Sequence, residues 1–142
     1  TRNQRGPPMT YEDDDLDDVA AAELVEEPHR EALYTSVYDF VDDWLLPNYQ
    51  RKPGPYRWDP NWFDNFEAVE RLTALWYAFE AARHDAAPAM AAFWLNPLDP
   101  MMRELTSPEG VFWYVRLYGE EGATASPEPF KSNGAPARIR SA

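Results

Sequence analysis

The stretch DNFEAVERLTALWYAFEAARH, residues 64–84, decides the fold, because it carries the most regular helical pattern in the chain. Its apolar face repeats every three or four positions, as along one side of a helix: Phe66, Val69, Leu72, Thr73, Trp76 and Phe79. Asp64 can cap the first turn while Glu67, three residues later, bonds back to it. The pattern predicts a helix from about Asp64 to His84 that forms the centre of the core.

Shorter helices are predicted on either side of this stretch. An apolar stripe predicts a helix from about Arg30 to Leu46, which Pro47 ends. Another helix follows Pro88, and a further one spans about Pro97–Leu105, each starting with the proline that first helical turns favour. Residues 111–118, VFWYVRLY, are aromatic and β-branched, and they predict a short strand or extended segment.

These elements predict a mainly α fold: a small helical domain of about four helices with a short C-terminal extended segment, flanked by flexible arms. We expect an acidic N-terminal arm over residues 1–32, an aromatic-rich helical core over 33–119, and a flexible C-terminal tail over 120–142. The tail is rich in Gly and Pro and poor in large apolar side chains, which is typical of a flexible segment. An aromatic content of 15% gives the core large side chains to bury.

The formal net charge of −12 is concentrated at one end of the chain. Residues 1–32 contribute −7, residues 33–119 contribute −5, and residues 120–142 sum to zero. A nucleic-acid-binding protein needs a basic stripe, and anionic lipid would repel this charge, so we expect no direct nucleic-acid binding and no membrane insertion. With no Cys and no signal-peptide pattern, we expect a location in the bacterial cytoplasm or in a virion.

The spacing of the acidic and His residues does not suit metal binding. Asp13, Asp15 and Asp17 have the alternate spacing of a calcium loop, but Asp18 and Leu24 stand where that loop needs Gly and Glu. Pro28 interrupts the Glu-x-x-His element formed by Glu26 and His29, and His84 lies far from both in sequence. We therefore expect no metal and no cofactor.

Asp39 and Asp43 lie one helical turn apart, beside Asp42, and could share a face as a pair of catalytic carboxylates. Hydrolases usually bring such groups from distant segments, and neighbours on one helix are commonly its solvent side. There is also no nucleophile elbow and no Gly-rich phosphate loop. We expect no catalytic residues and no enzymatic activity, with a small carboxylate enzyme kept as an alternative.

Two groups of residues are candidates for binding a protein partner. The first combines the arm's acidic block with the short apolar segment after it: Asp13, Asp14, Asp15, Asp17, Asp18, Leu24 and Val25. The second comes from an aromatic cluster just before the main helix, which could also stack a sugar or a base: Tyr56, Trp58, Trp62 and Phe63. Tyr56, Trp58 and Trp62 are its candidates for contact with a protein. Aromatic residues anchor interfaces when they are exposed, but core packing is the favoured interpretation of this cluster.

From Tyr34 to Phe112 the sequence resembles the actinobacterial family called domain of unknown function 4913. The resemblance rests on a specific middle block with weaker flanks: Trp44, Leu45, Pro47, Tyr49, Arg51, Arg57, Trp58, Pro60, Trp62, Glu67, Ala68, Arg71, Leu72, Leu75, Trp76, Glu80, Trp94, Asp99, Pro100, Leu105, Pro108, Gly110 and Phe112. The family tends to differ at a few positions, with Cys at Asp59, Trp at Phe63, His-Pro at Asn65 and Phe66, and Pro at Val111. Its members resemble short proteins of actinobacterial plasmids, conjugative elements and prophages, often near DNA-transfer genes.

The shared positions are mostly Trp, Leu, Pro and Gly, which favours a scaffold over a catalyst. We expect a non-enzymatic interaction or structural protein of an actinobacterial phage or mobile element, which docks to a multi-subunit assembly through its acidic arm and terminal tails. One alternative is an acidic DNA mimic that inhibits a basic host nucleic-acid-binding protein. Another is an accessory protein of conjugative DNA transfer.

Overall fold

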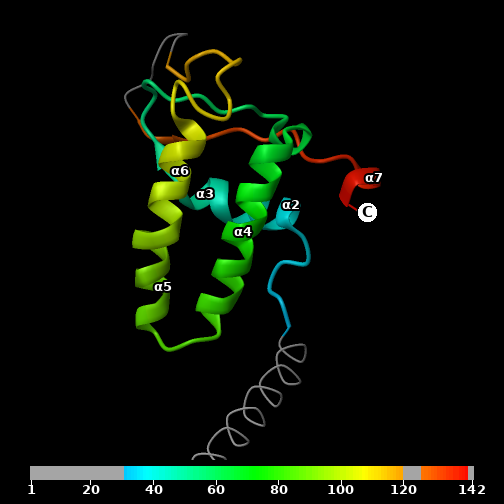
Figure 1. Ribbon diagram of the computed structural model, residues 1–142, viewed down its shortest axis with the longest axis vertical. Helices are drawn as coiled ribbons and strands as arrows, with labels where there is room; N and C mark the ends of the chain where they lie inside the picture. The colour runs from blue at the N-terminus through cyan, green and yellow to red at the C-terminus, as the bar shows by residue number, and fades with distance from the viewer. Residues whose placement is uncertain (1–30, 120–125, 141–142) are drawn as a thin grey trace, which may run out of the picture. The chain divides into compact units, whose positions relative to one another are not determined.

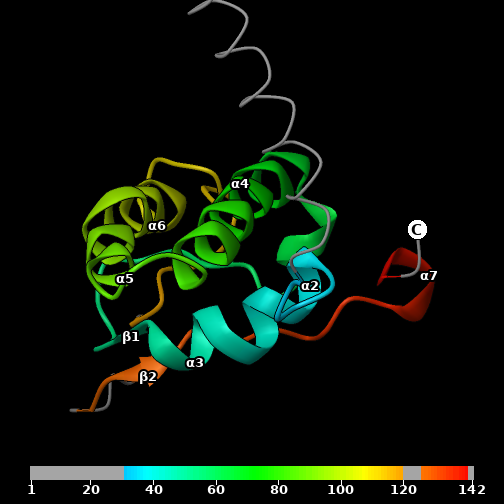
Figure 2. The same ribbon diagram turned by 90° about the horizontal axis from the view of Figure 1, so that it is seen from below.

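The computed structural model describes residues 31–119 and 126–140, and their fold is mainly helical, as the sequence predicts. The described residues from Tyr34 onward belong to one compact unit, and the following paragraphs concern that unit. Figure 1 shows α4 with the α5–α6 helix beside it, and Figure 2 shows α2 and α3 along another side of α4.

The first helical run has three consecutive elements: α2 (Val37–Phe40), a π-helical turn (Val41–Leu45) and α3 (Leu46–Asn48). Ser36 starts it, because its Oγ accepts the backbone N–H of Asp39 at 3.1 Å. The predicted start at Arg30 is therefore wrong. Pro47 does not end the helix, since it lies in the first turn of α3.

The longest helix, α4 (Phe66–Arg83), confirms the strongest prediction from the sequence but begins differently. Asn65 is its N-cap, with Oδ1 accepting the backbone N–H of Ala68 at 3.0 Å. The predicted cap at Asp64 is wrong, because Asp64 ends a preceding 3₁₀ turn (Trp62–Asp64). The buried face is Ala68, Leu72, Leu75 and Phe79, while Phe66 at the first position is 88% exposed.

The next helical run turns back along α4. It comprises α5 (Pro88–Phe93), a π-helical turn (Trp94–Leu98) and α6 (Asp99–Thr106). Pro88 begins α5, as predicted. Extended backbone angles at Asn96 kink the run. Helical backbone resumes at Pro97 and continues into α6, which agrees with the predicted helix over about Pro97–Leu105.

The strand predicted as one alternative for Val111–Tyr118 is wrong, because residues 111–115 form successive turns and residues 116–118 belong to no strand. The N–H of Trp113 donates to the carbonyl of Gly110 at 3.2 Å, and the N–H of Val115 donates to the carbonyl of Phe112 at 3.1 Å. Gly110 is required at the start, since a Cβ there would lie 2.7 Å from the carbonyl oxygen of Glu104. Close local turns therefore override the strand propensity of the side chains.

Extended pairing occurs instead between two distant segments, β1 (Gln50–Arg51) and β2 (Glu128–Pro129), which are antiparallel. We call residues 126–140 the C-terminal strap. The prediction of a flexible tail from residue 120 is wrong for this strap, because Phe130 is 2% exposed and Ala135 is 8% exposed within the core. One buried aromatic ring and a series of backbone contacts hold a segment whose composition is typical of a loop.

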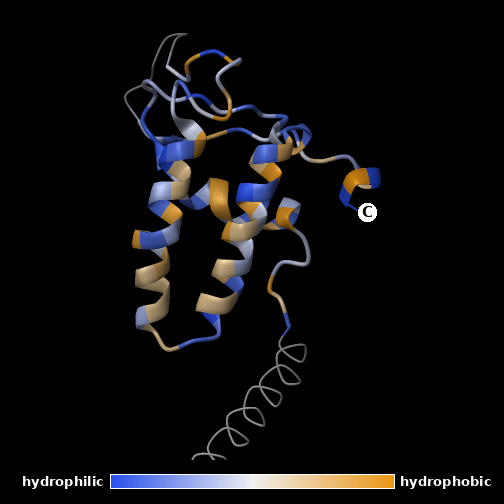
Figure 3. Cartoon of the chain, viewed as in Figure 1, coloured by the Kyte–Doolittle hydropathy of each residue, from blue (hydrophilic) through white to orange (hydrophobic). Residues whose placement is uncertain are grey.

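The strap ends in a short helix, α7 (Ala137–Arg140), in which hydrophobic and hydrophilic residues mix (Figure 3). Ile139 packs against the core, and Arg140 forms ion pairs with both Asp39 and Asp42. The strap is therefore attached at its far end by charge as well as by apolar contact. These pairs are partly exposed, so each contributes only a few tenths of a kcal/mol to about 1 kcal/mol.

Candidate functional site

The aromatic cluster before α4 serves the core. Trp58 is 6% exposed and Trp62 is fully buried. The Nε1–H of Trp58 donates to the carbonyl of Lys131 at 3.0 Å, and that of Trp62 donates to Ser132 Oγ at 3.0 Å. Tyr56 is half-buried, with its ring 6.1 Å from that of Phe130. The core interpretation is confirmed for both Trp residues, and the burial of Trp62 removes its ring from contact with a partner in this conformation.

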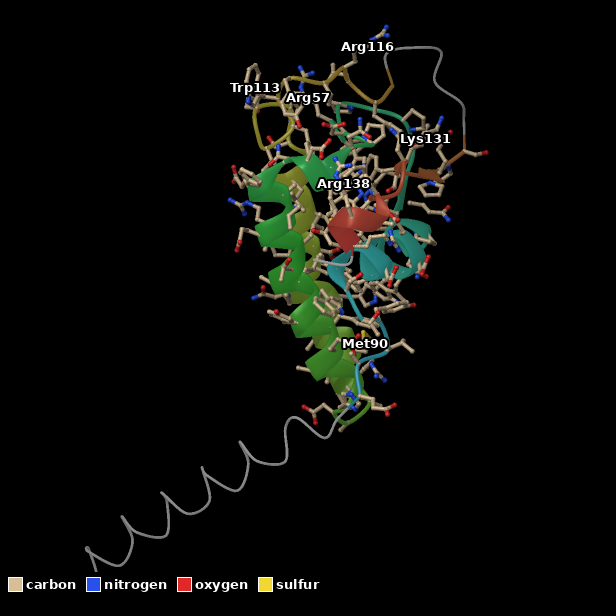
Figure 4. The ribbon with its side chains drawn as sticks, turned by 90° about the vertical axis from the view of Figure 1, so that its right-hand side faces the viewer. Arg57, Met90, Trp113, Arg116, Lys131 and Arg138 are labelled. Carbon is tan, nitrogen blue, oxygen red and sulfur yellow. The ribbon has the colours of Figure 1, made fainter. Side chains whose placement is uncertain are left out.

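Exposed aromatic residues occur on the turns after Gly110, where Trp113 is 68% exposed and Tyr114 is 48% exposed. We call these two residues the aromatic surface. Figure 4 shows Trp113 projecting outward from its loop. Their rings meet edge to face with centroids 5.8 Å apart. Exposed Trp and Tyr side chains are typical anchors of protein interfaces.

The hydroxyl of Tyr114 holds this surface in place. It donates to Asp59 Oδ2 at 2.8 Å and accepts from Asn65 Nδ2 at 3.2 Å. Burial raises the pKa of Tyr114 above its usual value, and the hydrogen bond to Asp59 acts in the same direction. The phenol therefore remains a neutral donor at neutral pH. Because Asn65 also caps α4, the start of that helix and the aromatic surface are joined by one side chain.

A pocket of about 360 Å³ lies at the same end of the domain, between the strap and the turns. Its lining is mainly aromatic and apolar with two cations at the edge: Trp58, Pro60, Val115, Arg116, Tyr118, Phe130 and Lys131. The rings of Trp58 and Phe130 stack with centroids 5.6 Å apart. Burial and the neighbouring Glu128 carboxylate raise the pKa of Tyr118 to about 12, so its phenol is also neutral.

Two of the three candidate catalytic carboxylates have structural partners. Asp39 and Asp42 pair with Arg140, while Asp43 is exposed on the same helical run. Within residues 31–119 and 126–140, no three His, Cys, Asp or Glu side chains converge as metal ligands would. No helix in this part of the chain has the length and apolar character needed to cross a membrane.

The predicted partner-binding residues of the arm lie outside the described residues: Asp13, Asp14, Asp15, Asp17, Asp18, Leu24 and Val25. Sequence reasoning did not single out Trp113 and Tyr114, because they stand inside a run that resembles a strand. The turn residues Pro108 and Gly110 just before this run are the signal that could have indicated exposed turns instead.

The fold defines a small, mainly helical domain with an aromatic core. The C-terminal strap packs on the end of this domain that carries the aromatic surface and the pocket. The chain matches the domain of unknown function 4913 (DUF4913) over residues 34–133, and it belongs to that family. The matched range extends into the strap, in agreement with the strap's burial. Neither a curated protein nor a solved structure matches the chain.

Asn65 makes one further bond to the turns that carry the aromatic surface. Its Nδ2 also donates to the carbonyl of Val111 at 3.4 Å.

Proposed function

We propose that this protein is a non-enzymatic interaction or structural protein that docks onto a partner protein through the aromatic surface of Trp113 and Tyr114. The observation that carries the proposal is the 68% exposure of Trp113 next to a Tyr whose hydroxyl is fixed by two side chains. Fixed aromatic groups lose little conformational entropy on binding, which makes them effective anchors.

The proposed setting is an actinobacterial phage or mobile element, with attachment to a multi-subunit assembly. The resemblance stated above supports this setting, and the acidic arm supports docking to a basic surface on such an assembly. The proposed location is the bacterial cytoplasm or the virion.

The contacts of the carboxylates favour this proposal over a DNA mimic. A DNA mimic presents an ordered array of carboxylates in place of phosphates. Here Glu67 bonds to Arg71 at 2.9 Å, and Arg140 engages both Asp39 and Asp42. Carboxylates that are neutralised within the domain contribute little to a phosphate-like array.

The test is quantitative affinity capture with the full-length chain, carrying an affinity tag, from cells of its source organism. We expect Trp113→Ala to lower the recovery of specific partners at least tenfold, since loss of an interface anchor costs about 2 kcal/mol or more. Trp113 is exposed, so this substitution should change the free energy of unfolding by no more than about 0.5 kcal/mol.

Tyr77→Ala is the matched control, because Tyr77 is a large aromatic residue that is 64% exposed on α4. The Tyr77→Ala chain should recover the same amount of each partner protein as the unsubstituted chain. Equal losses for Trp113→Ala and Tyr77→Ala, or no loss for either, would contradict docking through the aromatic surface.

A further inference from the structure

The two rings of the aromatic surface meet at a corner, and both side chains are exposed. The planes of the Trp113 and Tyr114 rings stand at 85° to each other, with centroids 5.8 Å apart. Two rings at this angle leave a corner that is bounded by one face of each ring. Figure 4 shows Trp113 directed away from the domain. Because the faces of aromatic rings carry negative charge density, such a corner suits a cationic group.

Two carboxylates adjoin this corner. Asp59 Oδ2 accepts the hydroxyl of Tyr114 at 2.8 Å, and Asp59 Oδ1 accepts the backbone N–H of Asn61 at 2.8 Å. Burial is the largest cause that raises the pKa of Tyr114, and the negative charges of Asp59 and Asp64 raise it further, so both carboxylates lie near the hydroxyl. Within residues 31–119 and 126–140, neither Asp59 nor Asp64 forms an ion pair. Both carboxylates therefore retain the capacity to pair with a cation of a partner.

The cation next to Asp59 in sequence, Arg57, is directed elsewhere. Its Nε donates to the carbonyl of Pro108 at 2.7 Å, and its Nη1 donates to the carbonyl of Val115. In the part of the chain that the structure describes, the cation that lies over an aromatic ring is Arg51, 3.7 Å from the centroid of the Tyr49 ring. The described Arg and Lys side chains thus leave the corner to a cation from another molecule.

We propose, on the basis of the docking function above, that the corner between Trp113 and Tyr114 binds an arginine side chain of the partner protein. The guanidinium stacks on a ring face and donates to the carboxylate of Asp59 or Asp64. Its planar shape matches both groups, whereas the ammonium of Lys is a compact and more strongly hydrated charge. A basic partner also fits the net charge of the whole chain, −12, which favours association with positive surfaces.

The test is an NMR titration of the full-length chain, labelled with ¹⁵N in its Trp indoles, with the peptide acetyl-Gly-Arg-Gly-amide. Six Trp residues give six indole resonances, and the Trp113→Phe chain identifies the resonance of Trp113. At about 50 mM NaCl we expect the Arg peptide to move this resonance in a saturable way. The matching Lys peptide should bind about two- to fivefold more weakly. The citrulline peptide, which has nearly the same shape without the charge, should bind at least about fivefold more weakly.

Substitution of the two carboxylates tests their part in the site. Asp59→Asn with Asp64→Asn removes both charges and keeps an oxygen for the hydroxyl of Tyr114, and it should weaken binding of the Arg peptide about two- to fivefold. The matched control is Asp43→Asn with Asp85→Asn, which makes the same chemical change at two exposed positions on other segments. Equal weakening in both chains would overturn the proposal, because it would assign binding to the general charge of the chain. If the first variant is less stable, Asp64→Asn alone supplies the measurement.

The outcomes also separate the arginine site from the docking function. A Trp113 resonance that the Arg peptide does not move would overturn the arginine assignment, as would equal affinity for the Arg peptide and for either the Lys or the citrulline peptide. If Trp113→Ala still lowers partner recovery in that case, docking through the aromatic surface stands and only its arginine ligand is rejected. Full partner recovery by Trp113→Ala would reject the docking function, and with it the partner as the source of the arginine.

Discussion

Replacing Phe130 by Ala tests whether the C-terminal strap is part of the core. Phe130 is 2% exposed, stacks on Trp58 at 5.6 Å, and meets Tyr118 and Tyr56 at 5.0 and 6.1 Å. A buried Phe→Ala substitution costs about 3 to 5 kcal/mol, from lost transfer free energy and the cavity that remains. We therefore expect Phe130→Ala to lower the free energy of unfolding by about 4 kcal/mol. This is a large part of the total stability of a domain of this size, about 5 to 15 kcal/mol.

The assay is urea denaturation followed by Trp fluorescence, which reports on all six Trp residues, including Trp58 and Trp62 beneath the strap. Lys131→Ala is the matched control, because Lys131 follows Phe130 in sequence but has an exposed side chain. This substitution should change the free energy of unfolding by no more than about 0.5 kcal/mol. A loss of less than about 1 kcal/mol for Phe130→Ala would refute the reasoning. Rapid trypsin cleavage after Lys131 in the unsubstituted, folded chain would refute it independently.

Two further outcomes follow from side chains near the same end of the domain. Asn65→Ala should cost about 0.5 to 2 kcal/mol in urea denaturation through loss of the α4 cap. Asn65→Asp keeps the capping oxygen and replaces the amide donor to Tyr114 and Val111 by a charged oxygen, so equal costs for both substitutions would contradict the capping role. Because burial and Glu128 raise the pKa of Tyr118 from its ordinary 10.0 to about 12, its neutral form adds stability that is fully present below pH 10 and lost as the pH rises to 12. Between pH 10 and 12, the melting temperature should therefore fall more steeply with pH for the unsubstituted chain than for Tyr118→Phe. Parallel curves of melting temperature against pH for the two chains would contradict the raised pKa of Tyr118.

The helical part of the fold could be predicted because its determinants are local. The apolar repeat of residues 64–84 places Leu72 and Phe79 on the buried side of α4, and Pro88 starts α5. The start of α4 is not decided locally, since Asp64 and Asn65 are both good caps and the preceding 3₁₀ turn determines which of them caps the helix. Nothing in a periodic pattern distinguishes two adjacent capping residues.

The candidate site was harder to predict, because its exposure depends on contacts between distant segments. The run from Val111 to Tyr118 has strand propensity throughout, yet Val111 and Phe112 are buried while Trp113 and Tyr114 are exposed. Strand side chains alternate between two faces, so two buried residues followed by two exposed ones require turns. The bonds from Tyr114 to Asp59 and Asn65 cross 55 and 49 residues of sequence, and no local pattern contains them.

The C-terminal strap supplies hydrogen-bond acceptors that the buried Trp side chains need, although its composition is typical of a loop. A buried indole N–H needs an acceptor, since leaving it unpaired costs about 1 to 3 kcal/mol. If Trp58 and Trp62 are core residues, some segment must supply two acceptors at their edges. Lys131 and Ser132, 73 and 70 residues away, supply them through a carbonyl and a hydroxyl. The prediction that both Trp residues are buried therefore already required a covering segment, and Phe130 marks it as the one large aromatic residue between Gly119 and the end of the chain.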